Sequence, residues 1–325
     1  MIIRMAHGGG GVETSRLIND VFMKYFANAV NAPMADAAVV DMPGKLAFTT
    51  DSFVVKPLFF PGGDIGRLAV CGTVNDLLTT GAKPLYLSAG FILEEGLGLD
   101  DLHAICKSMA DAAAEAGVCI VTGDTKVVEG SGGAYINTSG IGAIAAKPVR
   151  FEDAEGGDVL LLTGTLGDHH ACILSQRMRL DNDIESDVAP LTEIVAALAG
   201  AGVPLRGMRD VTRGGLATIL SEMAGTTGLA PVIREDSLPV ADNVRGFARI
   251  LGLDPLYMGN EGKILLVVPS AYAETAVAVI RAARYGERAT AIGTLERGSR
   301  PVLITRLAGK KILPPARGEG LPRIC

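Results

Sequence analysis

Two successive sets of strand and helix patterns, separated by one short polar segment, restrict the fold of this chain more than any other feature. In the first set, apolar runs and apolar residues at helical spacing predict strands over residues 37–55, 85–93, 118–128 and 133–145 and helices over 66–81 and 100–117. The stretch 37–55 is expected to form two strands around a turn at Pro43 and Gly44. Residues 147–157 follow neither period, and we expect a domain boundary there.

The second set begins at residue 158 and has the same mixture of elements. Its patterns predict strands over residues 158–164, 264–269 and 301–307 and helices over 191–202, 213–225 and 272–284. The two sets together indicate an α+β chain with domains over residues 1–150 and 151–308. Residues 309–325 follow neither period and contain Pro314 and Pro315, so we expect a flexible tail that reaches about 55–60 Å when extended.

Charge and composition argue against several classes of function. The 325 residues carry a net charge of -6 and no long run of Lys or Arg, which argues against nucleic-acid binding. The longest apolar stretch, 264–280, is interrupted by Pro269 and Glu274, so no membrane span is expected. The absence of a CxxC pair and of an apolar leader predicts a reduced, soluble, cytoplasmic protein. The cysteines that lie in apolar patterns, and are expected to be buried and inert, are Cys71, Cys106, Cys119 and Cys172.

Single aspartates at strand ends or beside glycines are the most informative polar pattern. They are Asp36, Asp51, Asp76, Asp124 and Asp210. Asp76 lies within an otherwise apolar helix pattern, where an unpaired carboxylate would be costly. Mg²⁺ is a suitable partner because it binds Asp oxygens together with substrate phosphate oxygens. The alternative interpretation is five unrelated surface or helix-cap carboxylates.

Several further residues are candidates for binding phosphate or for catalysis. Arg213, Gly214 and Gly215 open a predicted helix, and helix N-termini attract anions. Lys126 follows Asp124 by two residues, so both side chains should lie on one side of a strand. Glu261 lies between glycines just before a buried strand. Ordinary surface charges are the alternative for these two residues, and the adjacent histidines at 169 and 170 are expected to be solvated loop residues.

The order of the motifs TTDSF, NDLLTTGAKP, GDTK, RDVTRGGL and GNEGK resembles the ATP-binding superfamily of aminoimidazole ribonucleotide synthetase, selenophosphate synthase and thiamine-monophosphate kinase. Within it, HGGGG near the start and PRIC at the end are similar to the HypE family of hydrogenase maturation factors. The resemblance implies an N-terminal α+β domain that dimerises through a shared β-barrel, and a C-terminal α+β domain. It also implies ATP and Mg²⁺ as cofactors.

The resemblance also implies roles for individual residues. The metal would be held by Asp36, Asp76 and Asp210. ATP and its phosphates would be bound by Asp51, Asp124, Arg213, Gly214 and Gly215. Lys126 and Glu261 would lie beside the reacting group, and the last residue, Cys325, would carry the substrate.

The activity implied is the ATP-dependent dehydration of an S-carbamoyl group on Cys325 to a thiocyanate, which would supply cyanide ligands for the iron of [NiFe] hydrogenase. Glu261 would take the N–H proton, and Lys126 would orient or polarise the carbamoyl oxygen. The implied partners are the carbamoyltransferase HypF, the iron-carrying HypC–HypD complex and a second copy of the chain. The alternatives are a small-molecule kinase or synthetase of the same superfamily, an ATP-gated carrier, and, for Cys325, a frayed terminus without a role.

Overall fold

The structure is a computed structural model that describes residues 2–9, 11–32, 34, 37–42 and 44–316. Asp36 and Cys325 lie outside the described residues, so the expectations for both stay predictions.

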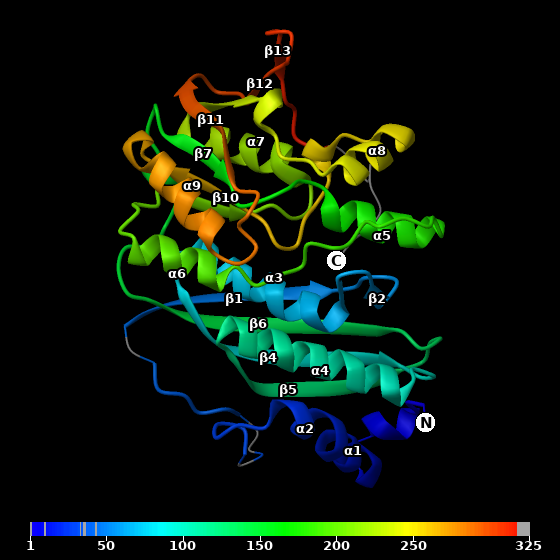
Figure 1. Cartoon of the computed structure of the whole chain (residues 1–325). Helices are drawn as coiled ribbons and strands as arrows, with labels where there is room; N and C mark the ends of the chain where they lie inside the picture. The colour runs from blue at the N-terminus through cyan, green and yellow to red at the C-terminus, as the bar shows by residue number, and fades with distance from the viewer. Residues whose placement is uncertain (1, 10, 33, 35–36, 43, 317–325) are drawn as a thin grey trace.

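The first half of the chain forms a sheet in the strand order β1-β6-β4-β5. Its strands are β1 (Lys45–Phe53), β4 (Lys83–Glu94), β5 (Cys119–Val128) and β6 (Ala134–Ile144), and a short pair, β2 (Phe59–Phe60) and β3 (Gly63–Asp64), follows β1. The helices α3 (Ile65–Thr79) and α4 (Leu99–Ala116) cover one face (Figure 1). Residues 37–42 form no strand, so the expected first strand around Pro43 is wrong.

The described residues before Ala27 include helices that the sequence analysis did not predict. They are η1 (Met5–Gly8), α1 (Val12–Leu17), the π-helical η2 (Ile18–Phe22) and α2 (Met23–Phe26). Figure 1 shows α1 and α2 below the β5 edge of the sheet. Phe22 packs against Phe91 of β4, with ring centroids 4.8 Å apart, so this segment extends the core of the first half.

The strand register assigns each side chain of the first sheet to one of two faces. Phe53 pairs with Ile136, and Ile136 pairs with Phe91, and all three are buried beneath the helices. Because successive strand residues point to opposite faces, Phe48 and Ile92 lie on the other face, where both are exposed. We call this second face, away from α3 and α4, the outer face.

The second half of the chain forms a sheet in the order β13-β12-β9-β11-β7-β10-β8. Its strands are β7 (Val159–Leu162), β8 (Gly207–Asp210), β9 (Leu229–Arg234), β10 (Ile264–Val268), β11 (Thr290–Arg297), β12 (Val302–Ile304) and β13 (Lys310–Ile312). Its helices are η3 (Phe151–Asp153), α5 (Asp168–Met178), α6 (Thr192–Gly200), α7 (Gly215–Thr227), η4 (Glu235–Ser237), α8 (Asp242–Leu251), η5 (Pro255–Tyr257), η6 (Ser270–Tyr272) and α9 (Ala273–Ala282). The α+β prediction is therefore confirmed.

Helix α3 links the two halves. Twelve of its residues are buried, which explains its apolar pattern on nearly every side. The Arg67 guanidinium donates to Glu115 of α4 at 2.9 Å, to the Tyr285 hydroxyl at 3.1 Å and to the Val188 carbonyl at 3.0 Å. These contacts join the first half to segments that belong to the second.

Three local predictions differ from the structure. His169 and His170 lie in α5 and are buried, so the solvated loop expected for them is wrong, and burial lowers the pKa of His170 to about 4. Cys119 is exposed at the start of β5, whereas Cys71, Cys106 and Cys172 are buried as expected. Part of the expected tail is held by the second sheet, because Lys310–Ile312 pair with β12 and Leu313 is 1% exposed.

Among the residues that the structure describes, no helix has the length and apolar character needed to cross a membrane.

Candidate functional site

A cavity of about 470 Å³ lies between the two halves of the chain. Its polar walls come from β1, α3, the end of β8, the start of α7 and the turn before β10, and they include Thr49, Asp51, Asp76, Asp210, Arg213, Thr218 and Glu261. The structure thus brings together Asp51, Asp76 and Asp210, which are far apart in the sequence. We call this space the aspartate cavity.

The carboxylates of the aspartate cavity are desolvated and repel one another. Burial, together with repulsion from Asp210 and Asp51, raises the pKa of Asp76 to about 6, although Thr49 donates a hydrogen bond of 2.9 Å to it. Burial also raises the pKa of Asp210 and of Asp51. Carboxylates in such surroundings are stabilised by a cation, because nearby positive charge favours their ionised form.

The donor set fits a magnesium ion that is bound jointly with a nucleotide. Among the described residues, no group of three or more His, Cys, Asp or Glu side chains is arranged to hold a metal ion without other ligands. Mg²⁺ does not need such a group, since it commonly binds one or two carboxylates and takes its other ligands from phosphate and water. Asp76 and Asp210 therefore fit as partial ligands of this kind.

Close packing explains why glycine occupies two positions beside the cavity. A Cβ on Gly72 of α3 would lie 2.8 Å from the Phe53 ring, so glycine lets β1 and Asp51 approach the helix. Gly215 has φ +64°, and a Cβ there would lie 2.5 Å from the Leu256 carbonyl oxygen. Its N–H donates to the Thr212 carbonyl at 3.0 Å, so this proposed phosphate donor already has a partner in the turn.

Glu261 lines the cavity from the loop before β10. The buried side-chain amides of Asn75 and Asn260 hold this loop in place. The Asn75 amide donates to the carbonyls of Ala189 at 3.0 Å and Glu261 at 3.4 Å. The Asn260 side chain accepts from the Gly167 N–H at 2.7 Å and donates to the Val211 carbonyl at 3.2 Å. Glu261 itself is 4% exposed.

The sequence analysis missed Asn75 and Asn260. The available signal was their position beside Asp76 and Glu261, next to apolar patterns where an amide needs partners.

Asp124 and Lys126 lie on the outer face and not in the aspartate cavity of their own chain. The register aligns Asp124 with Gly90 and Lys126 with Ile92, whose side chain is on the outer face. The Lys126 Nζ donates to both Asp124 carboxylate oxygens at 2.7 Å, and this contact lowers the Asp124 pKa. Three strand spacings of about 4.8 Å, or about 14 Å, separate β5 from β1.

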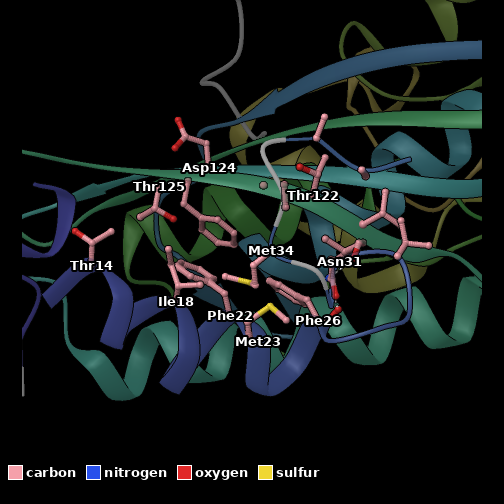
Figure 2. A pocket seen from close by; sticks show the side chains of 18 residues that line it. Thr14, Ile18, Phe22, Met23, Phe26, Asn31, Met34, Thr122, Asp124 and Thr125 are labelled. Atoms are coloured by element: carbon pink, nitrogen blue, oxygen red, sulfur yellow. Dashed lines mark hydrogen bonds between the residues drawn. The ribbon is translucent and has the colours of Figure 1, made fainter. Parts of the chain in front are cut away.

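A second cavity, of about 220 Å³, lies between the N-terminal helices and the inner side of β5. Figure 2 shows Ile18, Phe22, Phe26 and Met34 pointing into it, whereas Asp124 points away from these apolar side chains. Most of its lining residues are apolar and none is a Lys or Arg, so it is a poor candidate for holding phosphates.

Burial raises the thiol pKa of Cys71 and Cys106, and it raises that of Cys172 to about 11. Because the thiolate is the reactive form, these three cysteines are poor acceptors of a transferred group. The exposed Cys119 is the described thiol most open to reagents.

Two family models match most of the chain. The N-terminal domain of AIR synthase related proteins matches residues 34–144, and the C-terminal domain of the same proteins matches residues 155–306.

Relatives with known names are similar over nearly the full length. The carbamoyl dehydratase HypE of Rhodobacter capsulatus is 47% identical over 337 residues, which cover 99% of this chain and 98% of that protein. A crystal structure of the hydrogenase maturation protein HypE in complex with ATP is 46% identical, with a TM-score of 0.95 and 99% of both chains covered. A HypE–HypF complex contains a chain that is 45% identical, with a TM-score of 0.81, covering 92% of this chain and 99% of that one. This chain therefore belongs to the HypE family of AIR synthase related proteins.

Proposed function

We propose that this protein is a carbamoyl dehydratase that converts an S-carbamoyl group on Cys325 to a thiocyanate at the expense of ATP. The observation that carries the proposal is the aspartate cavity, which is lined by Glu261 together with Asp76 and Asp210, two carboxylates suited to Mg-ATP. A HypE structure in complex with ATP supports nucleotide binding by this chain.

The reaction has two balanced steps. The carbamoyl oxygen attacks the γ-phosphorus, an O–P bond forms, the bond to ADP breaks and one N–H proton leaves. The C–O bond then breaks as the second N–H proton leaves, and a C≡N bond forms with phosphate as the leaving group. The sum is carbamoyl thioester plus ATP to thiocyanate, ADP, phosphate and a proton.

The residues of the cavity meet the demands of these steps. Mg²⁺ bound with ATP would spread the charge on the transferring phosphoryl group. Arg213 adds positive charge beside Asp51 and so favours phosphate oxygens there. Glu261 is the proposed base because its carboxylate is held in the wall of the cavity by a loop with little freedom.

Lys126 reaches a reacting group at Glu261 only from a second copy of the chain. In its own chain it lies on the outer face, three strands from β1. The outer face also exposes the apolar side chains of Leu46, Phe48 and Ile92, and Phe48 is 70% exposed. We therefore propose the homodimer through a shared β-barrel, with the outer faces against each other.

The proposed partners follow from the chemistry and from the relatives. HypF would deliver the carbamoyl group, in keeping with the HypE–HypF complex. The iron-carrying HypC–HypD complex would accept the cyanide, and the reaction would take place in the cytoplasm.

The test is mass spectrometry of the C-terminal peptide after incubation with HypF, carbamoyl phosphate and ATP. The expected result is the gain of a carbamoyl group on Cys325 and then the loss of one water, with phosphate released in proportion. Cys325→Ala should abolish both changes, and Cys119→Ala, which removes the exposed described thiol, is the matched control. Carbamoylation without ATP-dependent water loss would favour the carrier alternative.

A further inference from the structure

The chain does not leave the second half of the protein at residue 308. Strand β13 pairs with β12, and the Leu313 N–H donates to the Pro301 carbonyl at 3.0 Å. Leu313 is 1% exposed and belongs to the second hydrophobic core. The buried leucine therefore holds the chain at a point five residues beyond the predicted boundary, 313 against 308.

Two side chains hold the next residues. The Tyr257 hydroxyl donates to the Pro314 carbonyl at 3.0 Å, and burial raises the Tyr257 pKa, which keeps the hydroxyl protonated. The Ala316 N–H donates to the Thr218 Oγ1 at 3.3 Å, and that hydroxyl donates to the Gly214 carbonyl at 2.9 Å. The donors and acceptors of these three hydrogen bonds all lie in the described part of one chain, so the contacts need no second copy.

These contacts place Ala316 beside the aspartate cavity. Thr218 and Arg213 line the cavity, and a Cβ on Gly215 would lie 2.8 Å from the Tyr257 Cα. The residues that hold 314–316 thus lie in the first turn of α7 and in η5, which packs against Gly215.

We infer that residues 313–316 anchor the C-terminal arm at the rim of the aspartate cavity of their own chain, with Tyr257 and Thr218 as positioning residues. The arm that carries Cys325 is then nine residues long (316 to 325) and reaches about 30 Å, in place of the 17 residues and about 56 Å counted from Ala308. This inference rests on the proposed function of Cys325.

The anchor raises the effective concentration of Cys325 at the cavity. Effective concentration falls roughly as the −3/2 power of tether length, so lengthening the arm from nine to 13 residues, counted from Ile312 at the end of β13, lowers it about 1.7-fold. Nine residues at about 3.3 Å still exceed the width of a cavity of about 470 Å³, so the shorter arm retains enough length to enter it and to withdraw.

The test compares a tethered substrate with a free one. The anchor variant is Tyr257→Phe with Leu313→Ala, and the matched control is Tyr272→Phe with Leu307→Ala, at side chains that are 41% and 95% exposed. The tethered reaction is the single-turnover loss of water from carbamoylated Cys325. The free reaction uses the full chain with Cys325→Ser and a synthetic S-carbamoyl peptide of residues 317–325.

The anchor variant should slow the tethered reaction about 1.7-fold or more and leave kcat/KM for the free peptide unchanged, whereas the control changes neither. Equal slowing of both reactions, or no slowing of the tethered one, would overturn the inference. Hydrogen exchange at the amides of Ile312, Leu313 and Ala316 tests the anchor without catalysis, since Pro314 and Pro315 have no N–H. Slow exchange in the wild type and fast exchange in the anchor variant support it. Fast exchange in the wild type would refute the anchor, and absence of water loss in the wild type would refute the proposed function instead.

Discussion

The two faces of the first sheet use the same residue types in opposite ways. On the helix-covered face, Asp51 lies with Asp76 in a desolvated cavity, and the pKa of Asp76 rises to about 6. On the outer face, Asp124 is exposed and paired with Lys126, and its pKa is lowered. Burial and neighbouring charge, and not the aspartate itself, decide which carboxylate needs a cation.

The comparison also shows that the two proposed catalytic residues, Glu261 and Lys126, do not meet within one chain. Glu261 lies in the wall of the cavity, whereas Lys126 points to the side where a second copy would dock. The predictions below test this division, beginning with the largest effect.

Mixing two inactive variants tests whether the site is shared between copies. Glu261→Gln and Lys126→Ala should each lower thiocyanate formation more than 100-fold, since loss of a general base or of a polarising cation typically has an effect of about this size. In refolded equal mixtures, half of the dimers contain one of each variant, and one of their two sites is complete. Turnover should then return to about one quarter of the wild-type value.

Glu296→Gln, at an exposed position of β11, is the control for Glu261→Gln. A mixture that stays inactive, while calorimetry shows normal Mg-ATP affinity of both variants, would contradict a site shared between two copies.

A charge on the outer face should dissociate the dimer. Phe48→Asp places a carboxylate within the proposed contact, where it would be desolvated and unpaired, so we expect monomers at concentrations where the wild type is dimeric. Sedimentation velocity measures the change. Ile250→Asp, at an 85% exposed side chain of α8, should leave the assembly as it is. If both variants behave like the wild type, the outer face is not the interface.

The smallest effect concerns stability. Because the Asp76 pKa is raised in the folded chain, ionising this residue costs stability as pH rises from about 4 to about 6, and the full cost is present at pH 7. Asp76→Asn should therefore raise Tm by a few degrees at pH 7 without magnesium or nucleotide, and by less at pH 4. Differential scanning calorimetry at the two pH values measures this.

With Mg-ATP present, the order should reverse, because the wild type gains the stabilisation of ligand binding that the variant loses. Asp124→Asn, on the outer face, is the control without ligand. It should not raise Tm at pH 7, since the Asp124 carboxylate is already stabilised by Lys126. If Asp76→Asn and Asp124→Asn raise Tm equally at pH 7 without ligand, ionising the carboxylate costs the same on both faces, and the comparison is wrong.

Local patterns predicted most of the elements. Helices α3, α4, α6, α7 and α9 and strands β4, β5, β6, β7 and β10 were anticipated from apolar periodicity. The elements that were missed include the N-terminal helices and β8, which has only four residues. This edge strand reads Gly-Met-Arg-Asp, and its single apolar side chain, Met208, forms neither an apolar run nor an alternation that could be recognised.

The candidate site was predicted as a set of residues but not as an arrangement. The sequence by itself determined that Asp124 and Lys126 share one side of a strand, that Asp76 needs a partner and that the Arg213 turn opens a helix, because these are local relations along one element. Only the tertiary structure decided that Asp124 lies away from Asp51, that Asn75 holds the Glu261 loop and that Ala316 lies at the cavity rim. Which face a helix covers, and which distant segments meet, depends on packing between elements, and that information is absent from the periodicity of any single element.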